Sequence, residues 1–242
     1  MHRTIGVIGG LGPWATLDFF ERVLRLTPAQ RDQDHLRLVI DNNPKIPDRG
    51  PAILGEAGAE DPTPALVATA RAVEGAGADL IVIPCNTAHY FHEAIRRAVG
   101  VPVLHIMEEV ARAAAVRMDG LTRVGLLSTR ATVATGLYQK AFAPAGTEVL
   151  APDPRDQAVI DRLIYAIKGG RADEALRAEG AAVGRRLGES GAGAIILGCT
   201  ELQLVLGEGN LGLPVFDSNQ ILAEAAVREA TLPQAAPHEV PV

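Results

Sequence analysis

The sequence is poor in cysteine, with two residues in 242, and in aromatic side chains, which make up 4% of the chain. Two cysteines cannot build the framework of a disulfide-rich secreted domain, and they fit a reducing compartment, where thiols stay free. No apolar run approaches the roughly 18 residues that a membrane-spanning helix needs. Runs of basic residues are also missing and the formal net charge is −6, so neither a membrane nor a nucleic acid is an expected partner.

The first residues predict a strand and not a targeting segment. Residues 1–13 hold a short apolar run that glycine interrupts, whereas a secretory signal needs a continuous apolar stretch. We therefore expect a soluble, cytoplasmic protein. A structural disulfide between the two cysteines is the alternative to two free thiols.

The chain contains an internal duplication. Three landmarks of the first half recur in the same order in the second half, at offsets of about 115 residues. The matched segments are 4–16 with 123–135, 75–85 with 191–199, and 100–103 with 212–215. An offset of this size indicates a duplicated domain, because the repeats of solenoid proteins are far shorter.

Short β-branched runs alternate with amphipathic segments in both halves, which predicts βα units and parallel strands buried on both faces. The predicted strands are 5–9, 36–41, 79–84, 101–105, 123–128, 148–152, 194–198 and 213–217. The expected fold class is α/β, with two duplicated open parallel-sheet domains related by pseudo-two-fold symmetry and an active site in the cleft between them. We expect residues 1–105 plus 217–242 to form the first domain and residues 106–216 the second. A helix at about 219–230 would then pack back on the first domain.

Both cysteines stand where an apolar strand ends. Cys85 follows the run 81–84, and Cys199 follows the run 195–198. Ligands of open parallel sheets bind outside the carboxyl ends of the strands, so facing domains would bring both thiols to one ligand from opposite sides. Two thiols related in this way suit a racemase that uses two bases. Taken singly, each cysteine would be interpreted as a small core residue.

Four segments resemble the aspartate/glutamate racemase family, the amino-acid racemases that work without pyridoxal phosphate. They are GVIGGLGPWAT at 6–16, NNPKIPDRG at 42–50, PCNTAH at 84–89 and LGCTEL at 197–202. The IPDR element and the Thr-Glu pair after the second cysteine resemble the aspartate racemase branch most. Trp14 departs from the pattern, since a smaller apolar residue is expected there.

The resemblance implies racemisation of aspartate without a cofactor or a metal. It also implies that the protein binds an amino acid as its small-molecule substrate and forms a homodimer. It assigns proton transfer to Cys85 and Cys199. It assigns substrate binding to Leu11, Arg49, Asn86, Thr87, Ala88, Thr129, Lys168 and Thr200. Arg49 and Lys168 match the cations with which the family binds an acidic side chain.

A thiol titrates near 8.5, so a catalytic cysteine needs help to lose its proton at neutral pH. The segments 86–99 and 200–206 predict helices that start directly after the cysteines, where the positive end of the helix dipole favours a thiolate. The same helix start, with Asn86, Thr87 and the following backbone N–H groups, can bind the α-carboxylate.

Several of these residues have a simpler structural interpretation. Ser128 and Thr129 can add hydroxyl contacts to the substrate or merely cap the next helix. Glu201 can orient Thr200 or the substrate ammonium, or be a favourable acid of a first helical turn. Lys168 can be a C-terminal helix cap instead of a substrate cation.

Two further patterns point elsewhere. His89 and His92 are spaced for one helix face, and a solvated face is favoured over a metal site because no other ligands are near. The run Gly10–Ala15 fits a dinucleotide-binding glycine pattern, with Asp41 ending the next predicted strand, so an NAD-dependent or nucleotide-binding protein is the alternative of another class. A broad-specificity racemase, a hydantoin racemase, a maleate isomerase and a decarboxylase are the alternatives with related chemistry.

Overall fold

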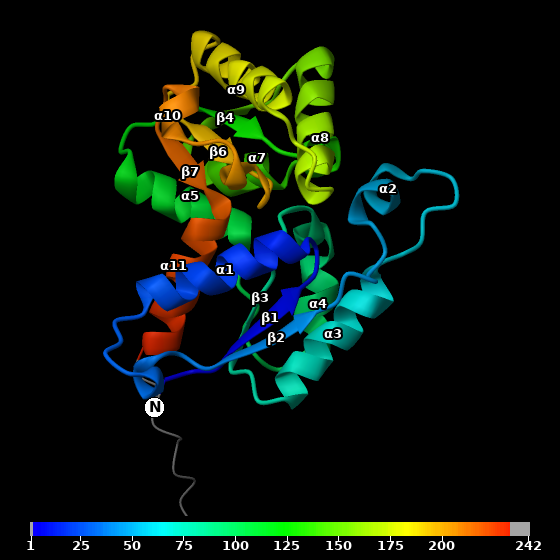
Figure 1. Ribbon diagram of the computed structural model, residues 1–242, viewed down its shortest axis with the longest axis vertical. Helices are drawn as coiled ribbons and strands as arrows, with labels where there is room; N and C mark the ends of the chain where they lie inside the picture. The colour runs from blue at the N-terminus through cyan, green and yellow to red at the C-terminus, as the bar shows by residue number, and fades with distance from the viewer. Residues whose placement is uncertain (1, 233–242) are drawn as a thin grey trace, which may run out of the picture.

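The computed structural model describes residues 2–232, which form two α/β domains, each built on a parallel sheet. The first sheet has the order β2-β1-β3 and the second the order β5-β4-β6-β7. The strands are β1 (Ile5–Gly9), β2 (Leu38–Asn42), β3 (Leu80–Val82), β4 (Arg123–Leu127), β5 (Glu148–Leu150), β6 (Ile195–Leu197) and β7 (Val215–Asp217). Figure 1 shows the two domains one above the other, with the second at the top.

The two sheets repeat one arrangement. In each, the first strand in sequence is central, pairing with the second on one side and the third on the other: β1 with β2 and β3, and β4 with β5 and β6. The predicted strand 101–105 is wrong in extent, because Val103 alone pairs with Ile81, through a single parallel bridge. That bridge lies where β7 lies in the second sheet, so the duplication read from the sequence is confirmed in the strand order.

Helices cover both sheets. They are α1 (Pro13–Leu26), α2 (Arg49–Leu54), α3 (Thr63–Gly75), α4 (His92–Ala98), α5 (Ile106–Arg117), α6 (Arg130–Thr135), α7 (Leu137–Phe142), α8 (Pro154–Lys168), α9 (Glu174–Glu189), α10 (Glu208–Leu211) and α11 (Ser218–Thr231). None of the helices between residues 2 and 232 is long and apolar enough to cross a bilayer.

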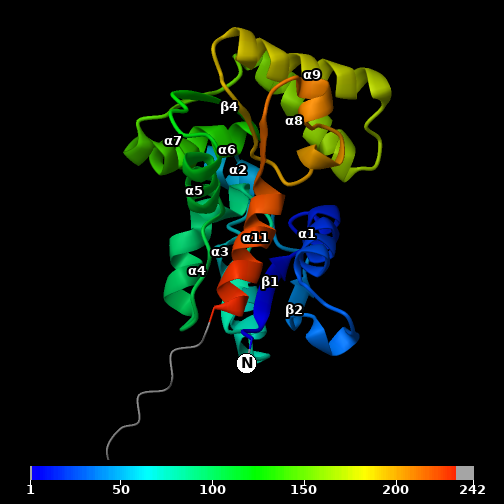
Figure 2. The same cartoon turned by 90° about the vertical axis from the view of Figure 1, so that its left-hand side faces the viewer.

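Helix α11 links the domains. It starts where β7 ends in the second sheet, and Figure 2 shows it descending beside the first sheet. It packs there against α1 and α5, as expected for the predicted helix 219–230. A continuous apolar cluster runs through this region and joins α1, α5, α7 and α11. The boundaries at 105/106 and 216/217 stay a prediction, and residues 233–242 of the first predicted domain lie outside the described residues.

Helix α2 completes the junction on the other side. It projects beyond the first sheet, toward the second domain, and contacts α6 there. The guanidinium of Arg130 on α6 binds the carboxylate of Glu56 at 2.6 Å, just after α2. The phenol of Tyr165 on α8 lies 3.5 Å from the carboxylate of Asp48, the N-cap of α2. The carboxyl ends of the central strands therefore face a space that is bounded by elements of both domains.

Candidate active site

The two cysteines lie just beyond β3 and β6, the equivalent strands of the two sheets. Cys85 is 6% exposed and Cys199 is 7% exposed, and each belongs to the apolar core of its own domain. Both are free thiols in the described part of the chain. The alternative of a disulfide is therefore not realised in the structure.

A hydrogen bond joins the loops that carry the cysteines. The hydroxyl of Thr200, next to Cys199, donates to the carbonyl of Pro84, next to Cys85, at 3.0 Å. The bond is buried and links residues 116 positions apart. The duplicated strand ends thus converge at one place, as the sequence predicts.

Glu201 lies directly against the thiol of Cys199. The thiol donates a hydrogen bond to Oε2 of Glu201 at 3.0 Å, and the carboxylate is 2% exposed. Burial raises the pKa of Cys199 well above its ordinary value, and the negative charge of Glu201 adds to the rise. Cys199 is therefore a protonated thiol in the ligand-free protein.

This state of Cys199 differs from the predicted one, in which a helix dipole favours the thiolate. The segment predicted as a helix at 200–206 forms only a 3₁₀ turn, Leu202–Leu204. Three residues align too few peptide dipoles to offset the burial of a charged sulfur. The predicted helix 86–99 is also interrupted, with a 3₁₀ helix over Thr87–Phe91 followed by α4.

Lys168 supplies the positive charge at this junction. It ends α8, and its ammonium lies 5.5 Å from the centre of the Tyr165 ring. Burial works to lower the pKa of Lys168, but Glu201 and the two cysteines are close enough to raise it, and the net shift is upward. Lys168 is therefore charged at neutral pH and acts electrostatically on both cysteines.

Two pockets open on either side of a shared wall. The wall consists of Asp48 and Arg49 from the first domain with Tyr165 and Lys168 from the second. One pocket continues to Thr87 and Thr129, and the other continues to the residues Leu11, Gly12, Trp14 and Glu201. Five of the ten predicted site residues, together with Glu201, line these pockets: Leu11, Arg49, Thr87, Thr129 and Lys168. Cys85, Cys199 and Thr200 do not line either pocket.

Arg49 is buried and already donates to three carbonyls. Its Nη2 donates to Leu11 at 3.0 Å, and its Nη1 donates to Pro47 at 3.1 Å and to Ile46 at 3.5 Å. Its Nε has no hydrogen-bond partner within residues 2–232. Arg49 thus fixes the loop before α2 to the loop after β1 and keeps one N–H group without a partner among the described residues.

Three threonine hydroxyls form a cluster at the domain junction. Oγ1 of Thr87 lies 2.8 Å from that of Thr132 and 3.2 Å from that of Thr129, and the latter two lie 3.0 Å apart. Thr129 also caps α6 by accepting from the N–H of Thr132. The cap interpretation of Thr129 is therefore confirmed, and the residue also lines one of the two pockets.

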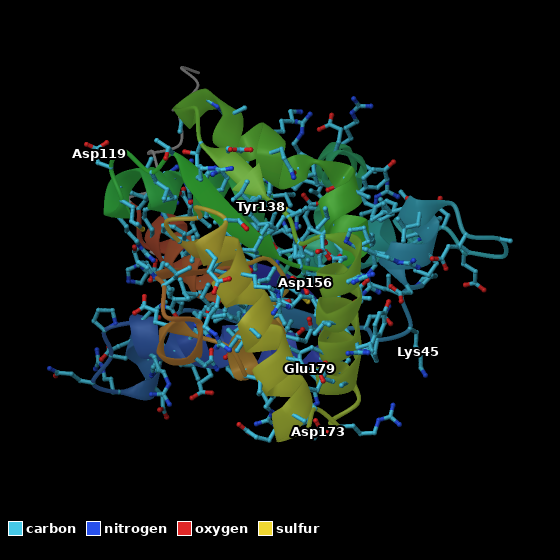
Figure 3. All side chains as sticks on the ribbon, turned by 90° about the horizontal axis from the view of Figure 1, so that it is seen from above. Lys45, Asp119, Tyr138, Asp156, Asp173 and Glu179 are labelled. Atoms are coloured by element: carbon cyan, nitrogen blue, oxygen red, sulfur yellow. The ribbon has the colours of Figure 1, made fainter. Side chains whose placement is uncertain are left out.

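Asn86 and Ala88 are buried and line neither pocket. The amide of Asn86 accepts from the Tyr138 hydroxyl at 2.7 Å and donates to the Ser218 hydroxyl at 2.9 Å, and all three residues are buried. Seen from above, Tyr138 lies well inside the outline of the molecule, whereas Lys45 lies at its edge (Figure 3). The side chain of Asn86 thus joins the loop after β3 to α7 and to the start of α11, and Ala88 is fully buried.

The prediction of a solvated face for His89 and His92 is wrong for His89, which is 2% exposed. Its ring stacks on that of His92 with centroids 5.8 Å apart, because residues three apart eclipse each other in a 3₁₀ helix. Between residues 2 and 232 no group of histidine, cysteine and acidic residues has the geometry of a metal site.

The glycine loop after β1 does not offer a place for phosphate. A Cβ built on Gly12 would come within 2.5 Å of Oε1 of Glu201. A buried carboxylate at this distance repels an anion, which is the opposite of what a dinucleotide-binding loop needs. Trp14 is 58% exposed at the rim of the same pocket.

Sequence reasoning missed Tyr165 and Asp48 as parts of the site. Asp48 stands in the IPDR element, so its position beside Arg49 was a signal. The place of Tyr165, three residues before Lys168 on the helix α8, was a weaker one.

Comparison with known proteins agrees with this arrangement. The sequence model of the family described as Asp/Glu/Hydantoin racemase matches residues 8–226. The broad specificity amino-acid racemase RacX of Bacillus subtilis (strain 168) is 31% identical over 229 residues, which cover 92% of this chain and 96% of RacX. The structure of Picrophilus torridus aspartate racemase superposes with a TM-score of 0.82 at 31% identity and covers 94% of both chains. Glutamate racemase RacE1 of Bacillus anthracis, with 18% identity and a TM-score of 0.66, shares the fold.

Proposed function

Because this chain belongs to the Asp/Glu/Hydantoin racemase family, we propose that it racemises an acidic amino acid, aspartate before others, by proton transfer between Cys85 and Cys199. The observation that carries the proposal is the position of these thiols after equivalent strands of two sheets, with their loops joined by the Thr200–Pro84 bond. Stereoinversion removes a proton from one face of the α-carbon and delivers one to the other, so it needs two groups on opposite sides.

The protonation state of the ligand-free site supports one half of the cycle directly. Cys199 is a thiol and can donate its proton to the α-carbon. In the proposed cycle Cys85 is the base that removes the proton of the D-enantiomer. The step leaves Cys85 protonated and Cys199 as a thiolate, which is the form that accepts the proton of the L-enantiomer. The charge of Lys168 lies close to both sulfurs and stabilises whichever one is ionised.

The polar groups suggest how aspartate binds. The hydroxyls of Thr87 and Thr129 can donate to the α-carboxylate, and Lys168 with Nε of Arg49 can bind the side-chain carboxylate. An unpaired carboxylate in such a site would be costly, so a matching cation is required. Oε1 of Glu201, which has no partner within the described residues, is placed to accept from the substrate ammonium.

A broader specificity is the second candidate. RacX, which matches 92% of this chain, is named for broad specificity. The exposed ring of Trp14 forms part of the pocket rim, where a larger side chain could contact it.

A racemisation screen tests both candidates. Each amino-acid enantiomer is incubated with the protein without pyridoxal phosphate, and the products are separated by chiral chromatography. Conversion of aspartate above all other substrates supports the first candidate, and similar rates for neutral amino acids support the second. Activity that requires pyridoxal phosphate, or that EDTA abolishes, contradicts the two-thiol chemistry.

We further propose that the protein works as a homodimer in the cytoplasm. Two free thiols fit the reducing conditions of that compartment. Size-exclusion chromatography with light scattering measures the mass in solution, and a species near the 25.4 kDa of one chain would contradict the dimer.

A further inference from the structure

His89 is a buried ring with both nitrogens engaged. Its Nδ1 lies 2.8 Å from the carbonyl oxygen of Cys85, and its Nε2 lies 3.1 Å from the backbone nitrogen of Ile106. Ile106 is the first residue of α5, which packs against α7 and α11. The ring therefore spans the gap between the loop of one predicted catalytic residue and the start of a packed helix.

These two partners fix the tautomer. A carbonyl oxygen only accepts, so Nδ1 must carry the hydrogen, and a backbone N–H only donates, so Nε2 must present its lone pair. An imidazolium could not make both bonds. Burial lowers the pKa of His89 well below its ordinary value, and the neighbouring His105 and His92 lower it further, so the ring stays neutral.

The other groups around the ring are compatible with a neutral His89. The His105 and His92 centroids lie 5.1 Å and 5.8 Å from that of His89. Two charged groups act on His105 with opposite sign: Glu108 raises its pKa and Lys140 lowers it. His89 is the member of this cluster of three rings that touches the loop of Cys85.

We propose that His89 is a positioning residue that holds the backbone of Cys85 and thereby sets the place of its sulfur at one face of the substrate α-carbon. The inference rests on the proposed function and deepens it. The loop is otherwise tight, since the N–H of Cys85 donates to the carbonyl of Ile83 at 2.7 Å. A displacement of about 1 Å at a reacting group can cost about 100-fold in rate, so the bond to His89 matters to proton transfer.

Two substitutions separate the two bonds of the ring. In His89→Asn the shorter side chain places an amide near Nδ1, where it can still donate to Cys85. In His89→Gln the longer side chain places its amide near Nε2, where it can accept from Ile106 but leaves the Cys85 carbonyl without its donor. His92→Gln is the matched control, because His92 belongs to the same stack but bonds to the carbonyl of Val103.

The readout is the partition of deuterium in deuterated water. His89→Gln should lower inversion about tenfold or more in kcat with little change in KM, since the substrate contacts stay in place. Exchange into recovered L-aspartate through Cys199 should continue, while exchange into recovered D-aspartate through Cys85 falls. His89→Asn should retain more of the Cys85 exchange, and His92→Gln should match the parent.

A second readout does not depend on racemase activity. Alkylation by iodoacetamide, followed by mass spectrometry of each cysteine peptide, should show a changed rate at Cys85 in His89→Gln and an unchanged rate at Cys199. A parent that exchanges no α-proton refutes the proposed function, whereas the alkylation rates still decide the role of His89. Equal effects on both cysteines, or none on Cys85, would overturn the positioning role, as would equal behaviour of the Asn and Gln variants.

Discussion

The hydroxyl of Thr200 donates to the carbonyl of Pro84 across 3.0 Å, so the residue after one cysteine is bonded to the residue before the other. A buried bond of this kind fixes the distance between two loops that come from different domains. Together with the bond from the Tyr138 hydroxyl to Asn86, it holds the domains together at the site even without a ligand. The arrangement favours a preformed site in which small errors of position have large effects on rate.

The two cysteines should be separable by the enantiomer that each serves. Cys85→Ser should lower racemisation by about 10²- to 10⁴-fold, because serine keeps the shape but its hydroxyl is far less acidic. Deuterium should still enter recovered L-aspartate through Cys199, and Cys199→Ser should show the reverse preference for D-aspartate. Proton NMR of the α-position in deuterated water measures both exchanges. If both variants lost exchange equally on both enantiomers, the two cysteines would not act as bases on opposite sides of the substrate. If either variant racemised aspartate at the rate of the parent protein, the substituted cysteine would be only a core residue.

Lys168→Met should lower kcat/KM for aspartate by an amount equivalent to about 2–5 kcal/mol, because the substrate carboxylate is left in the pocket without its cation. Lys45→Met, which changes an exposed lysine, is the control. Steady-state kinetics with aspartate and with alanine give the comparison, and alanine should be affected less. A Lys168→Met enzyme with unchanged aspartate kinetics would return Lys168 to the role of a helix cap.

Arg49→Ala should lower kcat/KM for aspartate and should also lower the melting temperature of the protein, because Arg49 donates hydrogen bonds to three backbone carbonyls.

Gly12→Ala should slow turnover without unfolding the protein. Gly12 has φ −109°, which alanine adopts easily, but the new Cβ would come within 2.5 Å of Oε1 of Glu201. The carboxylate would have to move, and its bond to Cys199 would move with it, so kcat should fall about 10- to 100-fold. Gly209→Ala is the control, because nothing lies within 4 Å of a Cβ there. Parental kcat in Gly12→Ala would show that the position of Glu201 is unimportant to Cys199.

His105 should make the protein less stable in mild acid. Burial, with His92 beside it, lowers the pKa of His105 to about 4 from an ordinary 6.5. Between pH 6.5 and pH 4, His105 is protonated in the unfolded chain but neutral in the folded protein. The free energy of unfolding therefore falls as the pH drops through this range. At pH 5 the loss from this group is about 2 kcal/mol.

Urea unfolding at pH 7 and pH 5 measures this loss, and His105→Gln removes the titrating group. The variant should lose less stability between the two pH values than the parent, while carboxylates titrate alike in both. Identical losses would mean that His105 is protonated as readily in the folded protein as in the unfolded chain.

The strand ends and the duplication could be predicted from the sequence, because buried parallel strands leave continuous apolar runs. Cys85 and Cys199 are found in this way. The type of the helical turns after these cysteines could not be predicted in this way, because α and 3₁₀ turns have similar sequence preferences and differ in how their side chains pack. His89 was misplaced for that reason: with three residues per turn it stacks on His92 and turns inward.

Long-range contacts set a second limit. The bond from Arg49 to the carbonyl of Leu11 spans 38 residues, and the contact of Tyr165 with Asp48 spans 117. Neither follows from periodicity or local spacing. The raised pKa of Cys199 likewise comes from burial and from the carboxylate of Glu201, and the extent of that burial depends on tertiary packing.

The packing of α11 against α1 also has a consequence for how the molecule is made. Arg22 of α1 bonds to Gln220 of α11, a partner 198 residues later, and nearly the whole second domain is synthesised in between. During translation the apolar face of α1 therefore stays uncovered, and the first domain stays incomplete, until α11 leaves the ribosome. Contacts between such distant residues slow folding and leave apolar surface open to aggregation in the meantime. The first domain is thus completed only after the second domain has been synthesised.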